Sequence, residues 1–448
     1  MFRKKHSLIK GTLILTSAGL VSRVLGFFFR IFLSHTFGEE QVGLYQLIFP
    51  FYALCLSLST SGLETAISRS VSRFHSLGRT QDGKLIFQTG LILSVLISLI
   101  CTLLVQKNSV FLSNRFLGDP RCATLLYLIV LALPAASVHS CICGYHYGLQ
   151  RTSVPAISQL IEQFVRISSV FVLYFIFIHS GVHPAIPLAV SGIIFGELAA
   201  AGYSLFSLKK GFDADSPYIL SISKSCSELL RLSVPLTVNR TAITFLQGIE
   251  AASIPVCLEL ASHSASEALS IYGVLTGMAL PCILFPCALT NSISLLLIPA
   301  VAQKQAESSS KETFLLIKKA AGGCFSLGLL CSVFFLLTGS FLGNFLFHST
   351  LASNFIVTLA WICPFLYTSS ALLSAINGLG LTTLTLMINL LGLSIRILSV
   401  YFGIPHYGIT GYLWGLFISQ SAVCLVALLT LSHEIKKEYL QSVESATD

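Results

Sequence analysis

The sequence predicts an all-α polytopic membrane protein with about twelve transmembrane helices, arranged as two parallel-related six-helix lobes around a central cavity. The first observation is composition: 54% of the 448 residues are hydrophobic and only 10% are charged, whereas about 25% are charged in a soluble globular protein. A series of long apolar runs and a one-sided distribution of basic residues are the second and third observations. Most of such a chain must lie in lipid.

Twelve apolar runs are each long enough to cross about 30 Å of hydrocarbon as a helix. They lie at residues 11–33, 43–66, 85–106, 122–147, 155–179, 186–208, 230–254, 268–301, 318–342, 353–376, 383–403 and 409–432. A polar interval follows the sixth run. We therefore expect an N-terminal lobe at 1–210, a cytoplasmic linker at 211–229 and a C-terminal lobe at 230–448 with a short cytoplasmic tail. Pro281 and Pro286 predict a kink in the eighth run.

The basic residues between the runs fall almost entirely on one side of this topology. With twelve spans the two termini share a side, and that side carries nineteen Lys and Arg residues against three on the other. Cytoplasmic loops of membrane proteins are enriched in Lys and Arg. We therefore expect both termini to be cytoplasmic.

The two halves of the chain resemble each other at a constant spacing. Residues 134–170 match residues 364–400 at an offset of 230, including "RISSV" and "RILSV", and "SGIIFGE" (191–197) resembles "WGLFISQ" (414–420) at an offset of 223. Apolar composition alone could produce some likeness, but the shared Pro–Gly–Arg spacing favours a repeat. Since each half has an even number of spans, the halves should be related by an axis along the membrane normal.

Charged residues inside the runs mark the candidate site. They are Arg23, Arg30, Arg166, Arg240 and Arg396, with Glu64, Glu162, Glu197 and Glu250. An arginine at the centre of a membrane helix costs roughly 2.5–3.5 kcal/mol on insertion scales, so such side chains need a wet cavity or a partner. A guanidinium binds oxyanions through two parallel hydrogen bonds and stays charged. We predict that Arg23, Arg166, Arg240 and Arg396 line a cavity for an anionic, phosphorylated cargo.

The remaining charged residues are candidates for pairing or ion coupling. Glu162 and Arg166 are four residues apart on one helix, the spacing of an ion pair; a structural pair and a ligand role for Arg166 both stay open. Arg30 lies near the predicted outer end and is able to reach the headgroups. Glu64 and Glu250 complete this set. We expect no cofactor, and a coupling ion, Na⁺ or H⁺, is left open.

Other chemistries find little support. No Walker loop, nucleophile elbow or pair of catalytic acids occurs, so we expect no enzyme. Cys141 and Cys143 are too close together for a zinc site, and we predict no metal site. His139, His146 and His183 lack ligand spacing and are predicted to be interfacial polar groups. The net charge of +8 is spread over short loops, which argues against a nucleic-acid partner.

Three stretches carry a resemblance to a known family. Residues 11–47, which contain "GLVSRVLGFFFR", residues 148–167, "GLQRTSVPAISQLIEQFVRI", and residues 271–303, which begin "IYGVLTGMALPCILFPC", resemble the polysaccharide-export and stage V sporulation protein B group of flippases. That group shares a superfamily with lipid II flippases, oligosaccharide-lipid flippases and multidrug and toxin extrusion exporters. Lipid II flippases have a similar Ser-Arg-x-x-Gly-Phe run whose arginine lines the cavity, and Arg23 matches it. Their second arginine corresponds to Phe29, and Arg30 follows.

The resemblance implies a two-lobed, alternating-access transporter in a bacterial plasma membrane. Its cargo would be an undecaprenyl-pyrophosphate-linked saccharide or a cell-wall or spore-cortex precursor, moved outward. The implied partners are the lipid-linked saccharide phosphate, membrane lipids and proteins of cell-wall synthesis. Two alternatives stay open: a cation-coupled small-molecule (multidrug) exporter and a non-transporting membrane scaffold for cell-wall assembly. The arginine excess favours the flippase, because a drug-cation exporter needs unpaired carboxylates.

Overall fold

The computed structural model describes residues 2–208, 221–306 and 310–444. These residues form helices with no strand among them, and eleven described stretches are long and apolar enough to cross a membrane. The first of them, Ile14–Ser76, contains two of the predicted spans. The prediction of an all-α polytopic membrane protein is confirmed. Part of the predicted linker, 211–229, lies outside the described residues, and its role as a linker stays a prediction.

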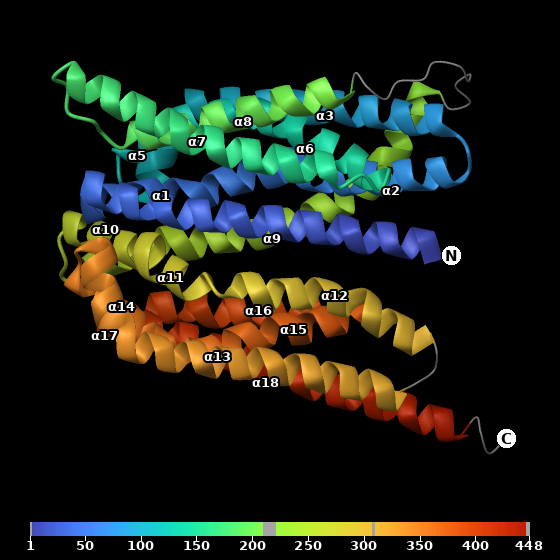
Figure 1. Cartoon of the computed structure of the whole chain (residues 1–448). Helices are drawn as coiled ribbons and strands as arrows, with labels where there is room; N and C mark the ends of the chain where they lie inside the picture. The colour runs from blue at the N-terminus through green and yellow to red at the C-terminus, as the bar shows by residue number, and fades with distance from the viewer. Residues whose placement is uncertain (1, 209–220, 307–309, 445–448) are drawn as a thin grey trace. The chain divides into compact units, whose positions relative to one another are not determined.

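The chain divides into two compact units, Met1–Ala252 (unit 1) and Ser253–Asp448 (unit 2). The helical segments of unit 1 are α1 (Phe2–Leu56), η1 (Ser57–Ser61), α2 (Gly62–Ser76), α3 (Thr80–Lys107), α4 (Ser109–Leu112), η2 (Ser113–Leu117), α5 (Cys122–Ile129), η3 (Val130–Ala132), α6 (Leu133–Gly148), α7 (Ser153–His179), α8 (Pro187–Leu208) and most of α9 (Ile222–Leu260). Within this unit, α7 packs along α8 and α1, and α2 packs against α3 and α6 (Figure 1).

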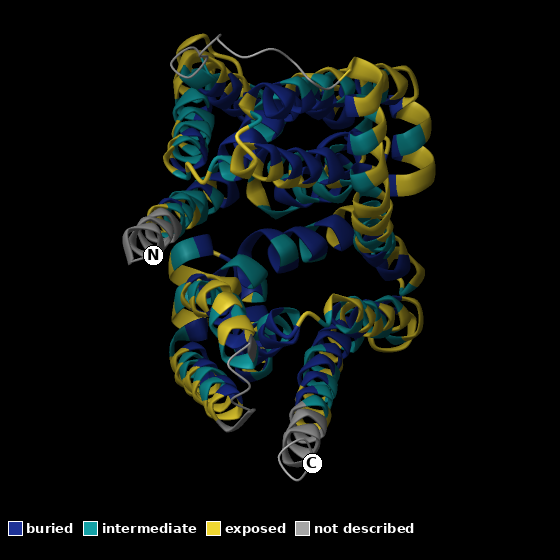
Figure 2. Ribbon diagram, turned by 90° about the vertical axis from the view of Figure 1, so that its right-hand side faces the viewer, coloured by how far each residue is buried: buried dark blue, intermediate teal, exposed yellow. Residues whose placement is uncertain are grey.

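Unit 2 contains the end of α9 and the remaining helices. They are α10 (Ala265–Gly273), η4 (Val274–Ala279), α11 (Leu280–Leu284), α12 (Cys287–Ala306), α13 (Ser310–Phe347), α14 (Thr350–Leu359), η5 (Ala360–Ile362), α15 (Cys363–Gly378), α16 (Thr382–Leu398), η6 (Ser399–Gly403), α17 (Ile404–Tyr407) and α18 (Ile409–Glu444). In this unit, α15 packs against α12, α13 and α18. Helix faces that meet within a unit are buried, and outward faces are exposed (Figure 2).

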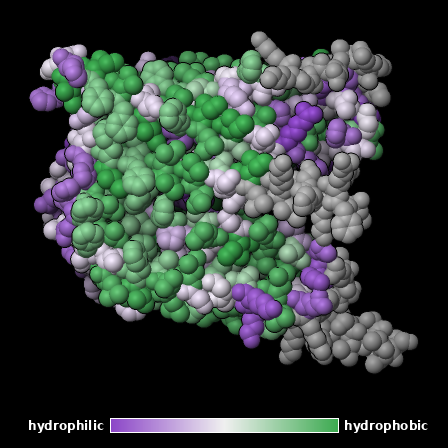
Figure 3. All heavy atoms as spheres, viewed as in Figure 1, coloured by the Kyte–Doolittle hydropathy of each residue, from purple (hydrophilic) through white to green (hydrophobic). Residues whose placement is uncertain are grey.

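The exposed helix faces are themselves apolar. Hydrophobic residues cover most of the face drawn in Figure 3, and hydrophilic residues gather towards the helix ends. Large exposed side chains include Leu103 and Leu104 on α3, Phe164 on α7, and Leu330 and Leu337 on α13. Contiguous apolar surface of this kind requires a covering, and here the covering is lipid.

A glycine bends the first helix between two predicted spans. Gly38 has φ 77° and ψ 173°, a conformation that residues with a Cβ rarely adopt. Two residues later, the carboxylate of Glu40 accepts a hydrogen bond from Arg121 Nη1 at 2.7 Å, and Arg121 Nη2 also bonds Asp119 at 2.8 Å. Hydrogen bonding to Asp119 and then to Glu40 raises the pKa of Arg121. The bend is thus tied to the start of α5 by a permanently charged group.

The predicted kink in the eighth run occurs at its second proline. Helix α11 ends at Leu284 and α12 begins at Cys287, with Phe285 and Pro286 between them. Pro281 closely follows the π-helical turn η4, and the helix continues through it to Leu284; a π-helical turn is a distortion that accommodates a proline within a helix.

The internal repeat extends to the backbone of the two units. Helices α6 and α15 have equal length and begin 230 residues apart, and each follows a three-residue 3₁₀ turn. Gly148 closes α6 against the carbonyl of Ser68, and Gly378 closes α15 against the carbonyl of Ile298, again 230 residues on.

The buried clusters of the two units repeat at the same offset. Ile67, Val71, Cys141 and Ile142 of unit 1 correspond to Leu297, Val301, Ala371 and Leu372 of unit 2, and all eight belong to hydrophobic cores. The two halves therefore resemble each other in their buried contacts as well as in their sequences. A similar apolar composition alone does not produce such a match.

The close approaches at Gly148 and Gly378 predict equal sensitivity in both units. A Cβ would lie 2.7 Å from the Ser68 carbonyl oxygen at Gly148 and 2.8 Å from that of Ile298 at Gly378. We expect Gly148→Ala and Gly378→Ala each to destabilise the protein by about 1–3 kcal/mol, the usual effect of overpacking. Gly322→Ala, with nothing within 4 Å, is the control. Melting temperatures of the purified protein in detergent test this, and an unchanged value for both variants contradicts it.

Candidate functional site

Two glycines on α8 bring α7 and α8 into close contact beside charged residues. A Cβ on Gly196 would lie 2.8 Å from the carbonyl oxygen of Glu162, and one on Gly192 would lie 2.8 Å from that of Arg166. Small residues four apart let membrane helices approach closely. This contact holds Glu197, the residue after Gly196, next to the charged face of α7.

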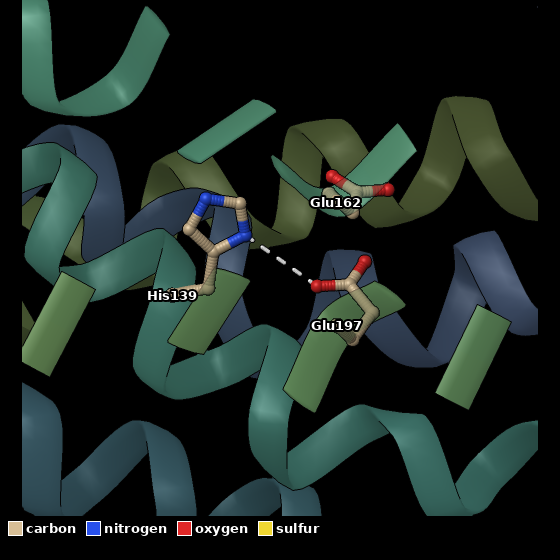
Figure 4. A group of neighbouring side chains, drawn as sticks. All are labelled: His139, Glu162 and Glu197. Carbon is tan, nitrogen blue, oxygen red and sulfur yellow. Dashed lines mark hydrogen bonds and ion pairs between the residues drawn. The ribbon is translucent and has the colours of Figure 1, made fainter. Parts of the chain in front are cut away.

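The residues gathered at this contact come from three helices (Figure 4). His139 of α6, Glu162 of α7 and Glu197 of α8 place one ligand atom each within 4.8 Å of the others. Glu162 also forms an ion pair with Arg166, as its four-residue spacing on α7 predicts. We call His139, Glu162, Arg166 and Glu197 the charged cluster.

Hydrogen bonds around His139 define where a proton must be. The hydroxyl of Ser158 donates to the carbonyl of Pro155 at 2.9 Å, so it accepts from His139 Nε2 at 3.0 Å. His139 Nδ1 then faces Glu197 Oε2 at 3.4 Å. This contact is favourable only when a proton lies on one of the two atoms. The charged cluster therefore has a place for one exchangeable proton.

Two buried polar atoms beside the cluster lack partners among the described residues. They are Arg166 Nε and the hydroxyl of Tyr52 on α1, and the charges of Glu197, Arg166 and Glu162 all act on Tyr52. Buried donors without a hydrogen bond are rare and point to a water or ligand. The ligand atoms of His139, Glu162 and Glu197 are also close enough together to coordinate a small cation.

A separate cavity of about 440 Å³, with both apolar and polar side chains in its lining, contains Arg240. Side chains of Ser57, Thr60, Ser61, Thr244 and Gln247 share its lining with Arg240. Ser57–Ser61 is a π-helical segment, a local distortion frequent at functional sites, and Ser57 and Thr241 hydroxyls bond at 3.2 Å. Among the described lining residues Arg240 is the one with a charge, which makes this cavity suited to an anion.

The other sequence candidates belong neither to the charged cluster nor to the lining around Arg240, although Glu64 lies near both His139 and Arg240. Arg23 is exposed on α1 and Arg30 is half-buried on the same helix. Glu250 is buried on α9, and Arg396 is half-buried on α16 of unit 2. Glu64 accepts a hydrogen bond from the Ser140 hydroxyl at 2.7 Å. The expectation that all four deep arginines line one central cavity involves both units and stays a prediction.

Sequence reasoning assigned no role to His139 and Glu197. His139 was expected at an interface on the grounds of spacing, but its partners Ser158 and Glu197 come from other helices. Spacing along the chain has no bearing on such contacts. The available signal was the coincidence of polar residues within three consecutive apolar runs.

Together, the two units built from one repeated helix pattern and the charges placed inside membrane helices define a multi-pass membrane transporter. The model of the family described as "Polysaccharide biosynthesis protein" matches residues 8–287, and the chain belongs to this family. The resemblance drawn from the sequence is confirmed.

Comparisons with individual proteins agree. The chain is 29% identical over 435 residues to stage V sporulation protein B of Bacillus subtilis (strain 168), which covers 96% of this chain and 84% of the relative. Its fold matches the lipid II flippase MurJ in an inward closed conformation, with a TM-score of 0.74, 15% identity and coverage of 96% and 91%. The fold also matches an inward-facing multidrug resistance MATE family transporter of the MOP superfamily with a TM-score of 0.74. The identity is 14%, and the match covers 94% of this chain and 96% of that transporter.

The ion pair on α7 predicts an asymmetric response to mutation. Glu162→Gln leaves the Arg166 charge without its carboxylate; breaking a buried pair costs about 3–5 kcal/mol. We expect the lower end or less, because about a fifth of each side chain is exposed. The double variant Glu162→Gln/Arg166→Gln should recover part of the loss.

Unfolding of the purified protein in mixed micelles measures this effect. Glu259→Gln, an exposed carboxylate on α9, is the control and should change stability little. Equal losses in the single and double variants would show that the pair does not balance charge.

Proposed function

We propose that this protein flips an undecaprenyl-pyrophosphate-linked saccharide, or a related cell-wall or spore-cortex precursor, outward across a bacterial plasma membrane. The observation that carries the proposal is the cavity around Arg240. The guanidinium gives this cavity a positive charge, and the other polar groups in its lining are hydroxyls and an amide. Phosphate oxygens are natural ligands for that set of donors. The 29% identity with stage V sporulation protein B along nearly the whole chain supports a role in spore formation.

The transport cycle follows from the repeat and the arginines. Two similar lobes, both with cytoplasmic termini, open a shared cavity alternately to each side. Arg240 binds the pyrophosphate, and Arg23 and Arg396 add positive charge along its route, whereas Arg166 is paired with Glu162. The saccharide travels with the phosphate, and the lipid tail stays in the bilayer. Each arginine then has a carboxylate or a ligand that offsets the cost of its place in the membrane.

We infer that the charged cluster couples transport to an ion gradient. The contact between His139 and Glu197 holds one proton, and a Na⁺ ion placed among His139, Glu162 and Glu197 would supply the same charge. Loss of either leaves two carboxylates facing one guanidinium. Because α6, α7 and α8 meet at this point, the change in charge acts on the packing of the whole unit.

The cation-coupled multidrug exporter is the alternative with some structural support. Its carboxylates would be those of the charged cluster, and the fold likeness to a MATE family transporter is compatible with it. That likeness, at 14% identity, concerns the fold alone. The positive charge of Arg240 in its cavity is unfavourable for a cationic drug, and this supports the flippase over the exporter.

Replacement of Arg240 tests the cargo. We expect Arg240→Gln to lower the rate at which a pyrophosphate-linked saccharide lipid appears in the outer leaflet of reconstituted vesicles by at least about tenfold, because a charge-assisted contact is lost. Arg115→Gln, an exposed arginine outside the predicted spans, should keep the full rate. Unchanged flipping in Arg240→Gln, or export of a cationic dye by the wild type alone, argues against the proposal.

Replacement of His139 tests the coupling. His139→Gln removes the exchangeable proton while a side chain of similar size still reaches Ser158. In the wild type, an imposed H⁺ or Na⁺ gradient should drive transport against a concentration gradient of the cargo. We expect His139→Gln to lose this driven transport and to keep downhill flipping. Flux measured in vesicles with and without each gradient checks this. Full gradient dependence in the variant would exclude the charged cluster as the coupling site.

A further inference from the structure

A second cavity, of about 500 Å³, lies at one end of unit 1. It is formed where α2 and α6 end, α3 and α7 begin and α8 ends, and it contains neither Arg240 nor any member of the charged cluster. This is the end of unit 1 at which the predicted cytoplasmic loops lie. Nothing in the transport cycle above uses it.

No carboxylate is among the described residues that line this cavity, and four basic side chains are. They are His75, Lys84, His146 and Arg151. Lys84 and His146 are 7% and 4% exposed, so these two groups are built into the fold. Two nearby acids form ion pairs with arginines that do not line the cavity: Asp82 pairs with Arg79 and Glu228 pairs with Arg73. None of the ion pairs among the described residues involves Arg151.

The backbone adds to this positive character. Thr80 and Ser153, the first residues of α3 and α7, both line the cavity, and neither helix start is capped by a side chain. The first N–H groups of a helix have no partner within it and carry partial positive charge. Two such helix starts at one cavity attract an anion.

A buried polar atom points to the missing ligand. The Ser207 hydroxyl donates to the carbonyl of Ser204 at 2.6 Å, so it accepts from His146 Nε2 at 3.2 Å. His146 Nδ1 is buried without a hydrogen-bond partner among the described residues, and such atoms are rare in native proteins. Tyr145 and Tyr203 bring hydroxyls to the lining. A phosphate beside His146 favours the protonated imidazole, whose Nδ1–H donates to a phosphate oxygen.

We propose that this cavity binds a phosphate group, separately from the transported cargo. Its position at the helix ends, where the predicted spans meet the cytoplasm, and the presence of Phe206 and Leu208 in its lining suit the headgroup of an anionic phospholipid. Basic pockets between membrane helices on the cytoplasmic side recognise such headgroups. A soluble phosphate ester shares the chemistry, and the experiment separates the two sources.

Phospholipid binding to the full-length protein tests the proposal. Phosphatidylglycerol is titrated into the detergent-purified protein, with phosphatidylcholine as the zwitterionic comparison, and bound lipid is counted by native mass spectrometry. We expect Arg151→Gln to weaken phosphatidylglycerol binding about tenfold, as for one charge-assisted contact. Arg115→Gln, which removes the same charge outside the cavity, should bind as the wild type does. Binding should weaken as salt is raised.

Two further arms make the outcome decisive. In the first arm, inorganic phosphate and glycerol phosphate are titrated into the protein in phosphatidylcholine nanodiscs. If Arg151→Gln weakens binding of these soluble ligands about tenfold and leaves phosphatidylglycerol binding unchanged, the site binds a soluble ester. In the second arm, Lys84→Gln, at a buried lining residue, should also weaken phosphate binding. If Lys84→Gln fails to fold, Arg151→Gln still tests the site, because Arg151 is exposed and lies in a loop. Equal binding of both ligand types by wild type and Arg151→Gln overturns the proposal.

Discussion

Charge placed inside apolar helices is the constraint on which this structure depends. Each ionised group taken from water into lipid needs a partner or a ligand, and the fold meets that need in two ways. On α7 the guanidinium of Arg166 pairs with Glu162, while the glycines of α8 bring Glu197 and, through it, His139 into the same cluster. At Arg240 the fold instead provides a cavity whose lining includes four hydroxyls, and the proposed cargo phosphate would balance the charge there.

The two halves share a scaffold but differ in chemistry. Ser419 contacts the carbonyl of Gly392 in unit 2, as Gly196 does that of Glu162 in unit 1. At the offsets of the repeat, the positions of Glu162, Glu197 and His139 are occupied by Gly392, Gln420 and Ser369. Arginine is kept in both halves, as Arg166 and Arg396, whereas the carboxylates and the histidine occur in the first half only. Ion coupling assigned to unit 1 follows from this difference.

Much of the fold could be predicted from the sequence, and the reason is physical. Backbone groups in lipid must bond internally, so long apolar runs become helices, and the proline at 286 and the repeat offset of 230 appear in the structure as predicted. The prediction left residues 34–42 as a connection between two spans; in the structure two helices meet there at Gly38, since a single glycine at positive φ makes the turn. The charged cluster was predicted only through Glu162 and Arg166, because the contacts of His139 join helices distant in sequence. The cavity linings likewise depend on packing between α2, α6, α8 and α9.

The central claim is that the protein carries a pyrophosphate-linked saccharide lipid, and chemical identification of lipids bound to it tests this most directly. The wild-type protein is purified in mild detergent from cells that make such precursors, and the co-purified lipids are extracted and identified by mass spectrometry. The account predicts an undecaprenyl-pyrophosphate-linked saccharide at near one molecule per protein, lost in Arg240→Gln. Its absence from the wild type, or equal retention by Arg240→Gln, would contradict the account.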